Sequence, residues 1–346
     1  MIVRDSRLTV LAALVFALAF PGYVNAGSAR PGYALVDTLH LSGPTRWDYL
    51  AFDSQRQRLF ITRGNSVDVL DVSMQKIIGS IPDTAGVHGV ALASVLGRGF
   101  ISDGAANTVT IFDLTTLQTV ATVPTGTEPD AIVYDPLTKR VFTANGDSND
   151  VTAIDAVTGS VINTIKLGGK PEFAVVDGRG RIYINVEDMS QLVVIDSQNL
   201  KVVEYYNLSP NCDSPTGLAI DNEKHRLFSV CSNQAMIVVQ ADTGKILDTL
   251  PIGAHSDAAV FDPKTKLAFS ANGDGTLTVV GASSADRYKV LQTIPTTLTA
   301  RTMALNPITH KLYLAAAEVD GIDPTTTRPH IKPDSFMILT VGPNVP

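Results

Sequence analysis

The sequence is poor in charge, in aromatic rings and in cysteine. Only 18% of its 346 residues are charged and 6% are aromatic, and it contains two cysteines and one tryptophan. A hydrophobic content of 45% with so little charge excludes an intrinsically disordered chain. The formal charge of −7, without any local basic patch, argues against a nucleic-acid partner, because nothing would hold the phosphates.

Several chemical signatures are also missing. The chain has no C-x-x-C-H motif for covalent haem, no G-x-S-x-G elbow, no H-E-x-x-H pair and no glycine-rich phosphate loop. No apolar run reaches the roughly 20 residues that a membrane-spanning helix requires. We therefore expect no membrane span and no resident cofactor, a divalent cation being the one cofactor that the sequence leaves open.

The first 26 residues have the pattern of a cleaved secretory signal peptide. Arg4 and Arg7 precede the mostly apolar run Leu8 to Phe20, and small residues up to Ala26 suit a signal peptidase. We predict that residues 1–26 are removed and that the protein is exported, to the periplasm or out of the cell. Residues 27–346 are then the mature chain.

The two cysteines are interpreted from this expected compartment. Cys212 and Cys231 are the only cysteines present, and an oxidising environment favours a disulfide between them. Two free buried thiols are the alternative that the sequence leaves open.

An internal repeat dominates the mature chain. Aromatic landmarks recur at intervals of 40 to 45 residues, and similar text surrounds them, as in FDSQRQRLFIT, YDPLTKRVFTANGD and FDPKTKLAFSANGD. The seven landmarks are Phe60, Phe100, Phe142, Tyr183, Phe228, Phe269 and Tyr313. Each copy is rich in β-branched residues and has no long stripe of period 3.6, which favours strands over helices.

The third copy shows the strand order within a repeat. It predicts strands at 131–134, 140–144, 151–155 and 161–166, joined by turns that contain Asp135-Pro136 and Thr158-Gly159. Four antiparallel strands every 42 residues or so is the period of a propeller blade. We predict an all-β fold, a single seven-bladed β-propeller over residues 27–346.

The last repeat indicates how the ring closes. It supplies three strands, near 303–305, 311–315 and 336–341, and the chain then ends without a fourth. We predict that the segment 33–41 supplies the missing outer strand by pairing with 336–341, which protects an open sheet edge. The same repeat carries an insertion, residues 318–335, that we expect to overhang one face as a lid or docking loop.

The repeat text resembles a known family. The recurring D-P-x-T-x-x-[VL]-[FY]-x-A-N followed by V-x-x-[IV]-D-x-x-T-G is similar to the YVTN-type repeat of exported, YncE-like bacterial β-propellers, over about residues 33–341. The resemblance implies a WD40-like propeller in an exported protein. It implies no single activity, because propellers of this kind include binding proteins, scaffolds and some enzymes.

A propeller brings equivalent positions of its first strands together at the channel mouth. Counting five residues back from the Asp or Asn that opens each first turn, or from Ala93 in the second repeat, gives one ring position per blade. The predicted ring is Asp48, His88, Asp130, Glu172, Thr216, Asp257 and Arg301.

The chemistry of this ring suits a cation. Crowded carboxylates repel one another, so the ring suits a cationic ligand or a divalent metal, for which His88, Asp130, Glu172 and Asp257 are the candidate ligands. The alternative is a wet channel mouth with no ligand.

A second group of residues is predicted around this ring. Trp47 and His255 adjoin ring positions and are expected at the same rim. Second-strand ends contribute side chains that can hydrogen-bond a guest or the ring, or simply make turns: Arg63, Asp103, Asn145 and Asn272.

Two functions follow from these features. The first, which we favour, is an exported, monomeric binding or scaffold module that presents an acidic funnel to a small ligand, an envelope component or a partner protein. The second is a divalent-metal-dependent enzyme, similar to propeller lactonases or streptogramin lyase, with Arg301 as an anion clamp. No catalytic residue is assigned from the sequence.

Overall fold

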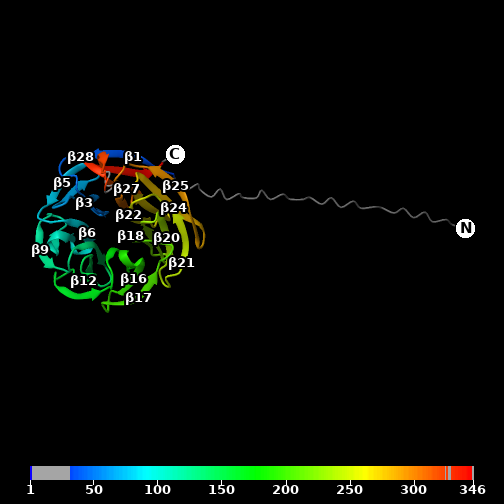
Figure 1. Cartoon of the computed structure of the whole chain (residues 1–346), viewed down its shortest axis with the longest axis horizontal. Coiled ribbons are helices and arrows are strands. Elements are labelled where there is room, and N and C mark those ends of the chain that lie inside the picture. Colours follow the sequence, from blue (N-terminus) through cyan, green and yellow to red (C-terminus); the bar gives the residue numbers. More distant parts are fainter. Residues whose placement is uncertain (2–31, 324, 326–328, 345–346) are drawn as a thin grey trace. The chain divides into compact units, whose positions relative to one another are not determined.

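Seven antiparallel sheets of four strands each make up the part of the protein that its computed structural model describes, namely residues 1, 32–323, 325 and 329–344. The sheets are arranged as blades around a central channel (Figure 1). The fold is thus the predicted seven-bladed β-propeller. The proposed signal peptide lies, apart from Met1, outside the described residues. No helix in the described ranges is long and apolar enough to cross a membrane.

The first strand of each blade lies at the channel. These strands are β2 (Leu50–Asp53), β6 (Val87–Ala93), β10 (Pro129–Asp135), β14 (Pro171–Val176), β18 (Pro215–Asp221), β22 (Ser256–Asp262) and β26 (Thr302–Asn306). Each contacts the first strand of the next blade, and β26 contacts β2. The contacts therefore form a closed circle, which places equivalent residues of the seven strands around one axis.

The second and third strands form the middle of each blade. The second strands are β3 (Arg58–Thr62), β7 (Arg98–Asp103), β11 (Arg140–Asn145), β15 (Arg181–Val186), β19 (Arg226–Cys231), β23 (Leu267–Asn272) and β27 (Lys311–Ile322). The third strands are β4 (Val67–Asp71), β8 (Thr108–Asp113), β12 (Asp150–Asp155), β16 (Gln191–Asp196), β20 (Ala235–Gln240), β24 (Thr276–Ser284) and β28 (Pro329–Pro343).

The outer strands complete the blades. They are β5 (Lys76–Ile81), β9 (Thr119–Pro124), β13 (Val161–Lys166), β17 (Lys201–Asn207), β21 (Ile246–Pro251), β25 (Arg287–Pro295) and β1 (Tyr33–His40). In blade three, β11 is buried except at Arg140, whereas β13 is exposed except at Ile165. Neighbouring blades cover both faces of the inner strands, which explains why the inner strands are nearly continuous runs of apolar residues.

The hydrophobic core lies between blades. Phe142, the landmark of blade three, packs in one cluster with Ala174 and Ile182 of blade four. Equivalent clusters follow one another around the ring, for example Phe228 with Ala259 and Ala268. The period of the aromatic landmarks is therefore the period of the blade interfaces.

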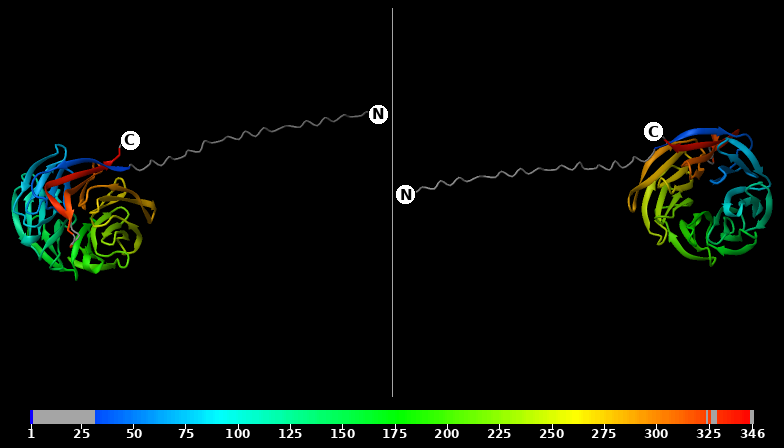
Figure 2. Two further views of the ribbon diagram at one scale, coloured as in Figure 1. Left: turned by 45° about the horizontal axis from the view of Figure 1, so that its top comes forward. Right: turned by 180° about the vertical axis from the view of Figure 1, so that it is seen from behind.

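The N-terminal strand closes the ring as predicted. β1 pairs antiparallel with β28, with Thr38 opposite Leu339 and His40 opposite Met337. Figure 2 shows these two segments, blue and red, side by side although they come from opposite ends of the chain. The last blade therefore takes its outer strand, Tyr33–His40, from the opposite end of the sequence.

The insertion of blade seven is not the loop that we expected. β27 continues to Ile322 and β28 begins at Pro329, and the two strands stay paired, with Val319 opposite Ile331 and Gly321 opposite His330. Residues 319–322 thus form a hairpin with 329–331, while a shift in register between Ala317 and Val319 leaves 332–335 without ladder partners. Residues 324 and 326–328 lie outside the described residues.

Candidate functional site

All seven predicted ring residues line one cavity at the end of the channel where the first strands begin. The cavity has a volume of about 340 Å³, and four further residues complete its wall: Lys170, Glu187, His255 and Ser256. We call this cavity the acidic mouth. It lies at one end of an axis shared by seven blades, so side chains more than 200 residues apart in sequence meet there.

β-bulges position most of the ring residues. In blade two, Val87 pairs with Asp103 and Val90 with Ile101, so that His88 and Gly89 lie opposite a single residue. The register shifts at the ring position in four other blades as well, at Asp130, Glu172, Thr216 and Asp257. A bulge removes its residue from the ladder and changes the direction of its side chain. The bulge repeat therefore places these side chains around the mouth.

His88 lies between two carboxylates. Its Nδ1 is 2.6 Å from Oδ2 of Asp48 and 3.6 Å from Oδ1 of Asp130. Burial lowers the pKa of His88, but the hydrogen bond to Asp48 and the negative charges of both aspartates outweigh burial and raise it to about 9. At neutral pH His88 is therefore an imidazolium that donates its Nδ1–H to Asp48.

Asp130 is less well satisfied. Burial and the charge of Asp48 raise its pKa to about 7, although the positive charge of His88 acts in the opposite direction. Its Oδ1 is buried and accepts no hydrogen bond from the described part of the chain. Asp130 is therefore close to half-ionised at neutral pH, and its Oδ1 has the His88 imidazolium at 3.6 Å as its ion-pair partner.

Glu172 has no hydrogen-bond or ion-pair partner among the described residues. Burial, followed by the charges of Asp130 and Asp257, raises its pKa to about 9. Nearby, the Lys170 ammonium donates to Glu187 at 3.0 Å. Its positive charge lowers the pKa of Glu172 but does not outweigh burial and the neighbouring carboxylates. At neutral pH Glu172 is therefore a neutral carboxylic acid.

Asp257 is held by a cation and a hydroxyl. Arg301 Nε lies 3.0 Å from its Oδ2, and the Tyr49 hydroxyl donates to its Oδ1 at 3.2 Å. Burial raises the pKa of Asp257 to about 6, while Arg301 lowers it. The Arg301 side chain is 56% exposed. Arg301 is thus engaged by Asp257 on one side and open to solvent on the other.

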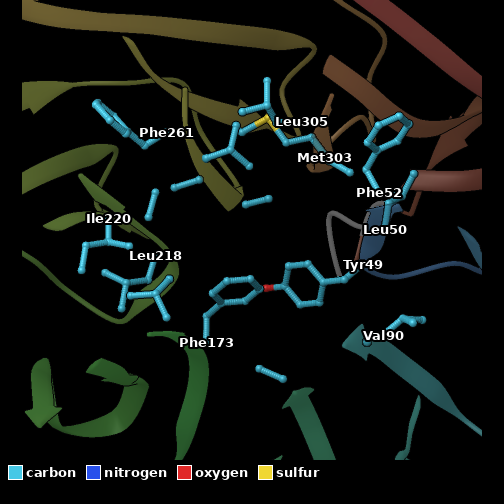
Figure 3. A pocket seen from close by; sticks show the side chains of 18 of the residues that line it. Tyr49, Leu50, Phe52, Val90, Phe173, Leu218, Ile220, Phe261, Met303 and Leu305 are labelled. Atoms are coloured by element: carbon cyan, nitrogen blue, oxygen red, sulfur yellow. The ribbon is translucent and has the colours of Figure 1, made fainter. Parts of the chain in front are cut away.

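The floor of the acidic mouth is aromatic. Tyr49 and Phe173 directly follow the ring residues Asp48 and Glu172, and their rings meet with centroids 4.8 Å apart. They come from blades one and four, and Figure 3 shows them pointing toward each other across the channel. The corresponding positions of the other five blades are small: Gly89, Ala131, Gly217, Ala258 and Thr302. Small residues leave the space that the two rings fill.

The predicted surrounding residues behave differently from the ring. His255 is exposed and lines the mouth. Trp47 instead packs against Phe336, with ring centroids 5.4 Å apart. Arg63 is buried over the ring of the same Phe336 and donates to the carbonyl of Ser42 at 3.1 Å.

The polar ends of the second strands face into their own blades. Asn145 donates to Asp150 at 2.7 Å, Asp103 accepts from Thr110 at 2.7 Å, and Asn272 donates to Thr278 at 3.1 Å. These bonds join second and third strands, and none of them reaches a ring residue. The three side chains fasten the blades and lie outside the mouth wall.

The cysteines form a disulfide close to the mouth. Cys212 and Cys231 are bonded and both are buried. Cys231 lies opposite Pro215 in the sheet, and its carbonyl accepts from the Ser256 hydroxyl at 3.3 Å. The disulfide therefore braces the connection into blade five, one residue away from the ring position Thr216.

Sequence reasoning missed five residues of this region, one of which is Ser256, the neighbour of Asp257. Lys170 precedes its strand and Glu187 begins a short 3-10 helix, Glu187–Met189, so neither falls on the repeat position that defines the ring. Tyr49 and Phe173 had a signal in the sequence, since they are the two large residues at a repeat position that is otherwise small.

Solved structures of low sequence identity share this fold. The chain is similar to Kuenenia stuttgartiensis hydrazine synthase (TM-score 0.69, 17% identity, 85% of this chain and 96% of that chain). It is also similar to U3-55K (TM-score 0.75, 12% identity, 89% and 99%) and to the RRP9 WD40 repeats (TM-score 0.75, 13% identity, 90% and 99%). No family model and no curated protein matches the chain. The protein is thus a seven-bladed propeller resembling WD40-type propellers.

Proposed function

We propose that this protein is an exported binding module whose acidic mouth holds a small, positively charged molecule. The observation that carries the proposal is that the mouth holds more carboxyl groups than cations. Glu172 has no hydrogen-bond or ion-pair partner among the described residues, and Asp130 shares the single His88 imidazolium with Asp48. A ligand cation would favour the ionised forms of these two carboxyl groups and offset their mutual repulsion.

The other charges of the mouth are already matched. Asp257 is paired with Arg301, Glu187 with Lys170 and Asp48 with His88. A ligand ammonium is therefore directed toward the remaining carboxyls. The volume of about 340 Å³ and the aromatic floor favour a small molecule over a protein segment.

Export is part of the same proposal. The disulfide between Cys212 and Cys231 supports an oxidising compartment, as do the charged and apolar segments of residues 1–26. We assign the repeats to the YVTN type on their sequence text. Mass analysis of the protein recovered from its native cells tests export, and a chain that begins at Gly27 is the expected result.

Titration of the purified protein with tetramethylammonium tests ligand binding, because this cation keeps its charge at every pH. Affinity should rise between about pH 6 and about pH 9, by up to about tenfold per pH unit, since a cation favours ionised Glu172. Glu172→Gln should weaken binding about tenfold. Glu223→Gln, an exposed glutamate elsewhere, is the matched control. Equal affinity in both variants would rule out the proposed site.

A divalent-metal enzyme is the second candidate, on one geometric observation. Ligand atoms of Asp48, His88 and Asp130 all lie within 4.8 Å of one another, in reach of a shared cation after modest side-chain rotation. Carboxylate and imidazole ligands suit such an ion, which would replace the proton that His88 shares with Asp48. In that case Arg301 would contact an anionic substrate at the same mouth.

Thermal unfolding distinguishes the two candidates. A metal site predicts a lower midpoint with chelator and a higher one with a fitting divalent ion, by mass action. Asp130→Asn should abolish that response. If neither chelator nor any divalent ion moves the midpoint, the metal-enzyme candidate is dropped, while binding of tetramethylammonium is unaffected by this outcome.

A further inference from the structure

A second cavity occupies the channel beyond the aromatic floor. It has a volume of about 380 Å³ and begins at Tyr49 and Phe173 (Figure 3). We call it the apolar chamber. Its wall consists of the residues that follow the ring position along the first strands, including Leu50, Leu218 and Met303.

The chamber is closed toward the acidic mouth and open at its other end. Tyr49 and Phe173 meet across the channel and separate the two cavities. Near this floor, Leu50 and Leu218 are buried, with exposed fractions of 8% and 1%. Two residues further along the same strands, Phe52 and Ile220 are only partly buried. The chamber therefore opens on the face that carries the turns between first and second strands.

No side chain of the chamber wall carries a charge. Apart from Tyr49, every lining residue is aliphatic, phenylalanine, methionine or glycine. The Tyr49 hydroxyl is directed to Asp257 on the mouth side, so it is not free for a guest. An ion or strongly polar molecule would lose its hydration here without compensation, whereas an apolar group gains by leaving water.

We propose that the apolar chamber is a binding site for the uncharged aliphatic part of a small molecule. Apolar cavities in proteins bind apolar guests because water inside them lacks hydrogen-bond partners. A chain that enters end-on from the open face would leave a polar terminus in solvent.

The volume of the chamber favours a small aliphatic molecule over a segment of a protein partner. A helix with its side chains is about 10–12 Å wide, and one turn of it would already exceed the chamber volume. A volume of about 380 Å³ lies at the lower end of the range for small-molecule pockets. The chamber is independent of the proposed cation site, because the two cavities share no charged or ring residue.

Calorimetric titration of the purified protein with straight-chain primary alcohols tests the proposal. Each added methylene group should tighten binding about fourfold, the factor that corresponds to burying one CH₂, until the chain outgrows the chamber. Saturating tetramethylammonium should leave these affinities unchanged. Failure of the alcohols to bind, or an affinity that does not depend on chain length, would overturn the proposal and leave the cation site untouched.

A size-preserving variant locates the binding. Val175 and Val260 line the chamber and are partly buried, so the double change Val175→Thr/Val260→Thr keeps the shape and adds two hydroxyls. It should weaken binding of the best alcohol about tenfold. The matched control is Val120→Thr/Val161→Thr on exposed outer strands, with exposed fractions of 55% and 43%. An equal loss in both variants, or no loss in either, would contradict binding in the chamber.

Discussion

The acidic mouth and the apolar chamber are built from consecutive residues of the same seven strands, yet they have opposite chemistry. The mouth gathers five carboxyl groups, two imidazoles and two long cations, whereas the chamber wall has no charged side chain. Tyr49 and Phe173 separate them within a single residue step. The difference teaches that in a closed ring of repeats one position along the strand determines the character of a whole cavity.

Removing one ring of the aromatic floor should join the two cavities, and it should have the largest effect on the free energy of unfolding. Tyr49→Ala deletes a buried ring and leaves a cavity, so the free energy of unfolding should fall by about 3–5 kcal/mol. Urea unfolding measures the change. Tyr205→Ala, an exposed tyrosine on β17, is the control and should change stability by less than about 0.5 kcal/mol. Similar losses in both variants would mean that Tyr49 does not pack as a floor.

Neutralising one carboxyl of the mouth should stabilise the protein at alkaline pH. The pKa of Glu172 is raised from its ordinary value of 4.5 to about 9, so the folded protein binds more protons than the unfolded chain between these values. The free energy of unfolding therefore falls as pH rises through this range, and Glu172→Gln should remove that slope. At about pH 9 the gain should be on the order of 1–3 kcal/mol, less than the full shift implies because the mouth is open to water.

The same measurement can contradict the predicted pKa of Glu172. If wild type and Glu172→Gln show parallel stability against pH, measured by urea unfolding across that range, Glu172 is ionised in the folded protein at neutral pH. The carboxyl groups of the mouth would then repel one another no more than carboxyl groups on an ordinary solvated surface do.

Removing only the hydroxyl of Tyr49 should have a smaller effect. Tyr49→Phe keeps the floor and deletes the bond to Asp257, which costs about 0.5–1.5 kcal/mol of unfolding free energy. It should also raise the pKa of Asp257 above about 6, since the hydroxyl lowers it. Carboxyl NMR titration follows that group, and an unchanged pKa would show that the floor and the mouth are not coupled there.

The last prediction concerns the charge of His88 and is measured as a pKa. Asp48→Asn removes the carboxylate that accepts from Nδ1 and should lower the pKa of His88 from about 9 toward its ordinary value of 6.5. NMR titration of the imidazole resonances measures this pKa. A value near 6.5 already in the wild type would show that Asp48 and Asp130 do not hold His88 as a cation.

The fold and the ring were accessible from the sequence because repetition supplies the geometry. Once seven copies are aligned, closure requires that Asp48, Asp130 and Glu172 surround one axis, whatever the details of each loop. The outer strand 33–41 followed from the same count, since the seventh copy lacked a strand.

What could not be predicted depends on side-chain direction and on residues outside the repeat frame. For Asn145 and Asn272 the sequence left open a role at the ring or a structural role in turns, and their amides donate to partners inside their own blades. Lys170 stands two residues before Glu172, as His255 does before Asp257, and Glu187 directly follows β15, but the ring count considered neither of these positions. The insertion at 318–335 was expected to be a loop, whereas β27 and β28 extend into it and pair at 319–322 and 329–331.

A crystal structure of the protein soaked with tetramethylammonium and a straight-chain alcohol tests the two-cavity channel most directly. Density for the cation should lie between Glu172 and Asp130, and density for the alcohol chain should lie beyond Tyr49 and Phe173, with no continuous water path between them. Guests found only on the outer surface, or a channel filled by unbroken water from mouth to opening, would contradict the account.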